Sequence, residues 1–131
     1  MDDNTPVLVG VAAFQQQNSD FHEALEPVAI MERVLRDAAA DAGSLELLSR
    51  AGEILVPRGM WAYSDPGRLL TDALGAQNAK TVFAEFGVSQ QSVLTRACQR
   101  IASAELEVVL VTGAEAKYRA LCASKAGEQA S

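Results

Sequence analysis

Apolar residues gather along the chain in four short runs that favour β-strands. These runs cover residues 6–14, 54–56, 81–86 and 107–113. The first and the fourth are apolar at successive positions, which is typical of strands that are buried on both faces of a parallel sheet. Pro57 ends the second run, because a proline cannot continue the ladder of a central strand.

Between these runs the apolar residues repeat with the period of a helix. The predicted helices start near Pro27, at Pro66 and at about Gln90, and Gly43 and Gly75 end the first two. Asp65 is expected to cap the second helix. The apolar stripes expected to face the core are Met31, Val34, Leu35, Ala38 and Ala42, then Leu69, Leu70, Ala73 and Leu74, then Val93, Leu94, Ala97, Cys98 and Ile101.

The resulting order is β-α-β-α-β-α-β, which predicts an α/β fold with a mostly parallel sheet and helices on both faces. Residues 45–51 are expected to form a helical turn, and the tail from about 115 to 131 a frayed helix. We expect one domain over residues 1–131, incomplete because four strands make a small sheet whose outer strands need further cover. The chain is therefore expected to associate with another polypeptide or with itself.

Charge and composition exclude several functions. The chain has 131 residues, 11 basic against 17 acidic, for a net charge of −6, which argues against nucleic acid or an anionic membrane as the main partner. It has no apolar stretch of the ~20 residues needed to span a membrane and no basic N-terminal signal region. The chain has two cysteines and a single histidine, His22, which argues against a disulfide framework and against a metal site. We expect a cytoplasmic protein without a tightly bound cofactor.

Several segments together resemble the thiolase superfamily. Leu25–Pro27 through Asp41–Gly43 is similar to the family's first helix, which commonly ends in D-A-G. Two segments of the family's N-terminal half have counterparts here, separated by a helix as in the family. Thr81–Val82 is similar to the start of T-V-N-x-x-C-x-S-G, and Ala104–Glu115 is similar to E-x-D-V-V-L-x-G-G-x-E. Residues 58–67 look like a divergent acetyl-CoA acetyltransferase-like branch related to the sterol-carrier thiolases. The resemblance covers residues 6 to about 119, part of the first of the family's two halves.

The resemblance implies acyl transfer, or carbon–carbon bond formation or cleavage, on coenzyme A thioesters. The family's cysteine nucleophile sits at a helix N-terminus, where the dipole and unpaired N–H groups stabilise a thiolate. The family spacing puts that position at Gly87, which cannot act as a nucleophile. The nearest hydroxyl, Ser89, is interpreted as a helix N-cap rather than as a substitute nucleophile. Cys98 is expected to be a buried core thiol.

The other candidate residues have ordinary structural interpretations beside functional ones. His22 is expected to face solvent in a loop, since the family's catalytic histidine belongs to the second half. Cys122 is expected to be exposed in the tail. Glu115 matches the family's glutamate after the fourth strand, and a structural hydrogen bond is favoured over catalysis. Trp61 and Tyr63, beside Arg58 and Arg68, are expected to pack over the sheet edge or to line a pocket or an interface.

Two hypotheses follow for function. The first is the N-terminal segment of a thiolase-like acyl-CoA acyltransferase, inactive alone, that acts on acyl-CoA as a homodimer or with a second half. The second is a non-catalytic assembly module that docks with a second polypeptide. A flavodoxin-like receiver is disfavoured, because Ala12–Gln15 stands where receivers carry an acidic pair.

Overall fold

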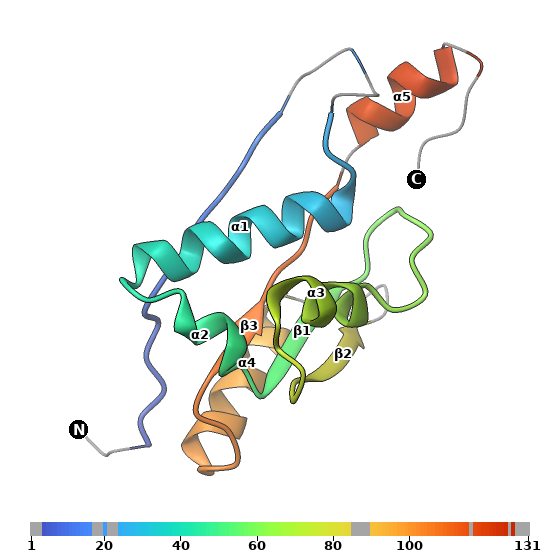
Figure 1. The fold of residues 1–131 in the computed structure, drawn as a ribbon. Coiled ribbons are helices and arrows are strands. Elements are labelled where there is room, and N and C mark those ends of the chain that lie inside the picture. The colour runs from blue at the N-terminus through green and yellow to red at the C-terminus, as the bar shows by residue number, and fades with distance from the viewer. Residues whose placement is uncertain are drawn as a thin grey trace.

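The chain folds into alternating helices and strands. A computed structural model describes residues 4–16, 20, 24–84, 90–115, 117–125 and 127. Its elements are α1 (Pro27–Asp41), α2 (Glu46–Ser49), β1 (Glu53–Pro57), α3 (Pro66–Leu74), β2 (Lys80–Ala84), α4 (Gln90–Ala102), β3 (Val109–Val111) and α5 (Lys117–Lys125) (Figure 1). No helix in these ranges is both long and apolar enough to cross a membrane.

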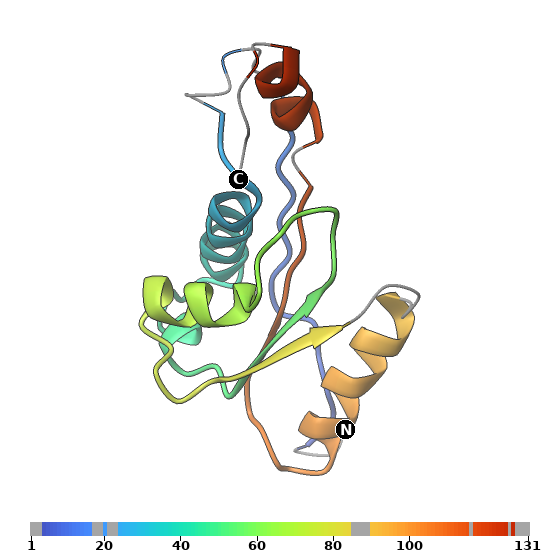
Figure 2. The same ribbon diagram turned by 90° about the vertical axis from the view of Figure 1, so that its right-hand side faces the viewer.

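The strands form one parallel sheet in the order β2-β1-β3. All of β1 pairs with β2, and residues 53–55 pair with β3. α1 and α3 lie on one side of the sheet and α4 on the other (Figure 2). The predicted α/β class, with a parallel sheet and helices on both faces, is confirmed.

The apolar residues of β1 supply both cores because their side chains alternate between the two faces. Ile54 and Val56 enter the larger core, where they meet buried residues of α1, α2 and α3 such as Met31 and Leu70. Leu55 faces the other way, into a smaller core. The uninterrupted apolar run of this strand therefore reflects cover on both faces, as the sequence predicts.

The ends of α1 and α3 follow the local sequence. α1 begins with Pro27, and Gly43, at φ 88°, follows its end. In α3 the carboxylate of Asp65 accepts a hydrogen bond from the Arg68 backbone N–H at 3.1 Å. Gly75 ends this helix in the left-handed conformation, with φ 74°, which a glycine adopts at little cost.

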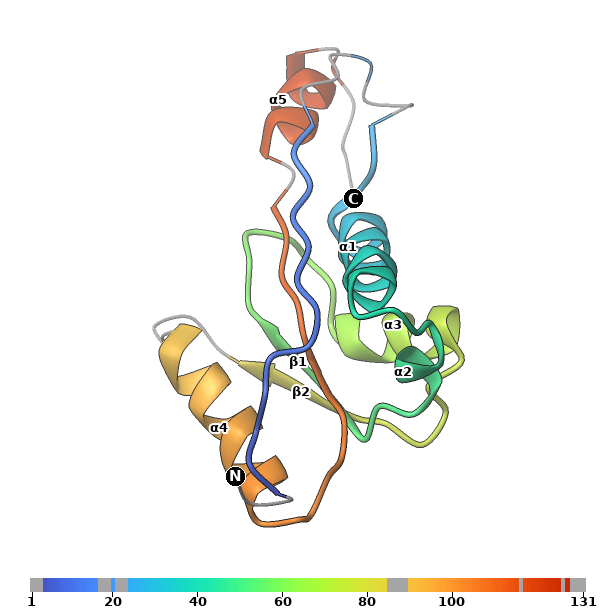
Figure 3. The same ribbon diagram turned by 90° about the vertical axis from the view of Figure 1, so that its left-hand side faces the viewer.

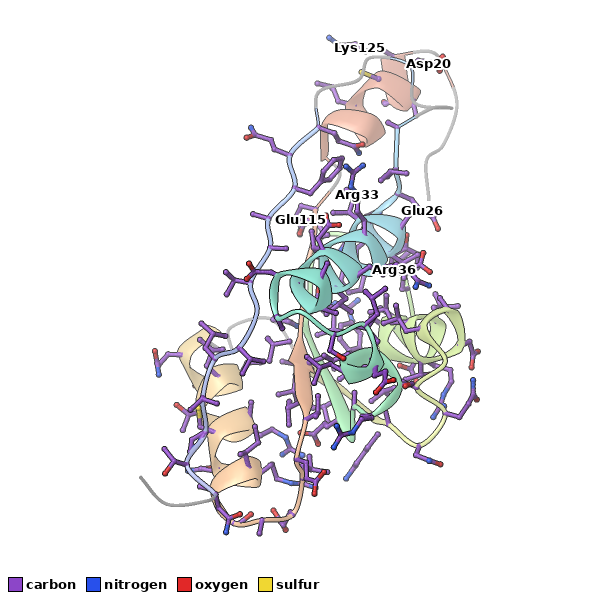
Figure 4. The ribbon with its side chains drawn as sticks, turned by 60° about the vertical axis from the view of Figure 1, so that its left-hand side comes forward. Asp20, Glu26, Arg33, Arg36, Glu115 and Lys125 are labelled. Carbon is purple, nitrogen blue, oxygen red and sulfur yellow. The ribbon has the colours of Figure 1, made fainter. Side chains whose placement is uncertain are left out.

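The prediction of a buried strand over residues 6–14 is wrong. This segment has no regular secondary structure, and Leu8 is 80% exposed. Beyond Gly10 it runs antiparallel to α1: the Val11 N–H donates to the Asp41 carboxylate at 3.0 Å, and the Phe14 ring lies 4.2 Å from the Arg33 guanidinium carbon. Figure 4 shows Arg33 pointing from α1 toward this segment. Because β3 pairs directly with β1, the middle of the sheet has no place for the segment.

Other boundaries shift modestly. The second predicted strand is confirmed as β1, and the third as β2, although residues 85–86 lie outside the described residues. The fourth predicted strand is shorter than its apolar run, since only Val109–Val111 pair. The helix at 90–102 is confirmed, and the tail contains the helix α5.

Candidate functional site

The carboxyl ends of the three parallel strands meet at one edge of the sheet, which is where α/β proteins usually bind ligands. Two segments at this edge lie within the described residues. They are the loop of residues 58–64 after β1 and residues 112–115 after β3. The segment after β2, which contains Gly87 and Ser89, lies outside the described residues, so the predicted nucleophile position is not placed.

Trp61 anchors the loop after β1 on the sheet. Its ring stacks on Phe83 of β2, with centroids 5.5 Å apart and an angle of 13° between the planes. It also meets Tyr63 at 5.2 Å. The indole N–H donates to the Ala114 carbonyl at 2.8 Å. Trp61 is therefore a packing residue over the sheet edge whose one polar atom is satisfied, which is one of the two predicted roles.

Glu115 holds the same loop from the β3 side. Its carboxylate accepts a hydrogen bond from the Met60 backbone N–H at 2.6 Å. A Cβ atom at Gly59 would collide with this carboxylate and with the Trp61 indole, so the close approach requires a glycine. This hydrogen bond is the structural role that the sequence favours for Glu115.

Two further contacts join this edge to its neighbours. The Tyr63 hydroxyl accepts a hydrogen bond from the Val28 N–H at 3.3 Å, and Val28 lies in the first turn of α1, where backbone N–H groups have no partner within the helix. The Arg58 guanidinium lies 5.3 Å from the Phe83 ring centroid, and the Arg58 N–H donates to the Ala84 carbonyl at 2.7 Å. These contacts connect the loop after β1, the sheet and α1. Arg68, the other arginine near this loop in the sequence, is exposed on α3.

Thr112 is the one side chain at this edge with an unsatisfied polar atom among the residues that the structure describes. It follows β3 directly and is 7% exposed. Its hydroxyl is buried and has no hydrogen-bond partner. Nothing in the sequence distinguishes this threonine, because it sits inside an apolar run and has the pattern of a strand residue.

Cys98 is exposed, so its predicted burial is wrong. α4 packs on the sheet through Val93 and Ala97, which meet Leu55 in the smaller core. Leu94 and Cys98 lie one position further round the helix, and Leu94 is 46% exposed. A helical stripe that is wider than the surface it contacts leaves one side in solvent.

The remaining candidate residues do not gather at this edge within the described ranges. Cys122 on α5 is half-buried rather than exposed, and His22 lies outside the described residues. No group of three or more His, Cys, Asp or Glu side chains that could hold a metal ion occurs in the part of the chain that the structure describes.

A buried ionic cluster at the amino end of β1 was not anticipated. The Glu53 side chain is fully buried, with one oxygen 3.1 Å from an Arg96 nitrogen and 3.7 Å from an Arg100 nitrogen. Glu105 pairs with Arg100 at 3.0 Å. Side chains alternate along β1, so Glu53 lies on the same face as Leu55, toward α4. The two-residue spacing between Glu53 and Leu55 is the sequence signal that could have predicted a contact between this carboxylate and α4.

Comparison with known proteins supports the fold. No protein-family model matches the chain, and no curated protein matches it. Among solved structures it is similar to a monomeric SCP2-thiolase-like protein of type 1 from Mycobacterium smegmatis, with a TM-score of 0.65 and 24% identity over 87% of this chain. The match spans 24% of that protein's length. The chain therefore has the fold of part of a thiolase-like protein.

Proposed function

We propose that this chain is the N-terminal segment of a thiolase-like acyl-CoA acyltransferase and has no acyltransferase activity by itself. The observation that carries the proposal is the likeness of 87% of the chain to a thiolase-like structure. The parallel sheet supports it, because its carboxyl edge leads through residues 85–89 into α4. The resemblance puts the family's acyl-accepting cysteine in this segment, before a helix start that would stabilise a thiolate.

The glycine at position 87 supports the proposed lack of acyltransferase activity. An acyl group taken from coenzyme A needs a nucleophile, and glycine offers none. The substrate class of the complete protein would be an acyl-CoA in lipid metabolism, and its setting the cytoplasm. A homodimer or a second polypeptide half would complete the site.

The test is to restore the missing nucleophile. The full chain and its Gly87→Cys variant are incubated with acetyl-CoA, and acetylation is measured by intact-mass and peptide mass spectrometry. We expect no site-specific adduct on the original chain, and acetylation of the introduced thiol at least tenfold faster than that of Cys98. Cys98 is an internal control because it is exposed on α4, the helix that follows residue 87 in the chain.

Equal acetylation of both thiols would contradict the proposed site. Thiolysis of acetoacetyl-CoA by the unmodified chain would contradict the proposed inactivity.

A non-catalytic assembly module is the second candidate function. The observation that favours it is the exposure of apolar side chains at Leu8 and Leu94, since such surfaces mark interaction sites when they are contiguous. It predicts a stable complex with a second polypeptide in which Gly87→Cys acquires no reactivity.

A further inference from the structure

Residues 4–9, which we call the N-terminal arm, include apolar side chains that are exposed to solvent. Val7, Leu8 and Val9 are 57%, 80% and 59% exposed. No backbone hydrogen bond joins the arm to the rest of the described chain. Branched apolar residues in an extended, unpaired segment are typical of a strand without its neighbour.

The arm is held at its C-terminal end, where Gly10 and Val11 contact α1. Gly10 lies so close to the Ala38 carbonyl that a Cβ atom would collide with it, and Val11 is bound to Asp41. From these contacts the arm passes the C-terminal end of α1 and runs toward the end of the molecule where α4 ends (Figures 1 and 3).

The sheet offers a matching edge. β3 pairs with β1 on one side, and none of the other described strands pairs with its second side. The Val108 carbonyl accepts a hydrogen bond from the Gly52 N–H, just before β1, and the Thr112 N–H donates to the Leu55 carbonyl of β1. Backbone groups alternate in direction along a strand, so Val109 and Val111 direct theirs to the open side. An exposed edge of this kind is a template for another strand.

The arm and the β3 edge both lack charged residues, which favours their pairing with each other. The chain carries a net charge of −6, yet residues 4–19 and 108–114 contain no charged side chain. Pairing the arm with the edge therefore buries no charge and sets no acidic side chains against each other. Because one chain carries both elements, two copies satisfy both arms and both edges in a closed, symmetric exchange.

We propose that two copies of this chain associate by exchanging N-terminal arms, each arm adding a strand to the open β3 edge of the other copy. The occupant of the edge is a second copy of this chain. The inference does not depend on the proposed acyltransferase function.

The test is the oligomeric state of the full chain by light scattering over a concentration series. We expect a dimer that Leu8→Asp weakens at least tenfold. The matched control is Leu69→Asp, which adds the same charge at a leucine that is 48% exposed on α3 and is expected to leave the dimer intact. Val111→Pro removes one outward N–H from the edge and is also expected to give monomers.

Mixing the two defective variants gives the sharper result. Val111→Pro keeps an intact arm and Leu8→Asp keeps an intact edge, so together they are expected to form a heterodimer through one exchange. Hydrogen exchange is expected to protect the Val109 and Val111 amides in the dimer only. A monomer at all concentrations, equal effects of Leu8→Asp and Leu69→Asp, or a monomer with both amides protected by its own arm would each overturn the proposal.

Discussion

Glu115, Gly59 and Trp61 decide where the loop after β1 lies. The carboxylate and the indole each reach across to the other segment, and the glycine between them leaves room for both. Sequence alone indicates that residues 58–64 form a loop rich in aromatic residues. It does not indicate that Glu115, 55 positions away from Met60, fixes this loop, because the partner is set by how β1 and β3 are brought together.

Gly59→Ala is expected to destabilise the chain by about 1–3 kcal/mol, since the new methyl group would force the Trp61 ring or the Glu115 carboxylate to move. The matched control is Gly113→Ala, where a Cβ atom would meet only the Pro57 Cδ at an ordinary 3.8 Å. Urea denaturation followed by far-UV circular dichroism measures both. Equal midpoints for the two variants would show that the close approach at Gly59 is not needed.

Among the elements, α4 depends on its contact with β1 more than its own sequence indicates. Its fully buried contact is small, with Val93 and Ala97 against Leu55, and four partly buried residues of β2 and β3 pack around it. The Glu53 cluster adds an ionic contact at the amino end of the strand. The helix at 90–102 is predictable from its period, but which side faces the sheet is not, since Leu94 and Cys98 are as apolar as the residues that are buried.

Glu53→Ala is expected to cost about 1–3 kcal/mol, because it leaves Arg96 beside the core without its anion and Arg100 with Glu105 alone. The cost falls toward the low end of that range because the Arg96 side chain is 41% exposed and keeps some hydration. The control is Glu107→Ala, which removes a surface pair with Arg50 and is expected to change stability by less than ~0.5 kcal/mol. Thermal and urea unfolding compare the two, and similar losses would show that the buried cluster contributes no more than a surface pair.

For the whole molecule, the two sides of the sheet differ in how much they bury. The larger core joins α1, α2, α3 and β1, whereas the smaller core between α4 and the sheet has three buried residues with four partly buried ones packed against them. The arm and the outer side of α4 leave apolar side chains exposed on the described surface. Such an uneven structure is expected to open in parts rather than all at once.

Native-state hydrogen exchange is expected to show α4 opening before α1 and β1, since fewer buried contacts hold it. Mass spectrometry of peptides covering 90–102, 27–41 and 53–57 makes the comparison, and the protection factors of the first are expected to be at least tenfold lower. Equal protection in all three would indicate a single cooperative unit and would argue against two unequal cores.

The sequence by itself determined the α/β class, the parallel strands at β1 and β2, the ends of α1 and α3, and the likeness to thiolases. The class, the strands and the helix ends depend on local period and capping chemistry, which act over a few residues, whereas the likeness to thiolases depends on the order and spacing of matching segments. Only the tertiary structure decided that residues 6–14 lie outside the sheet, that Cys98 is exposed and that Glu53 is buried. Each of these depends on which distant segment occupies a neighbouring place, and an apolar run has the same local pattern whether or not its neighbour is present.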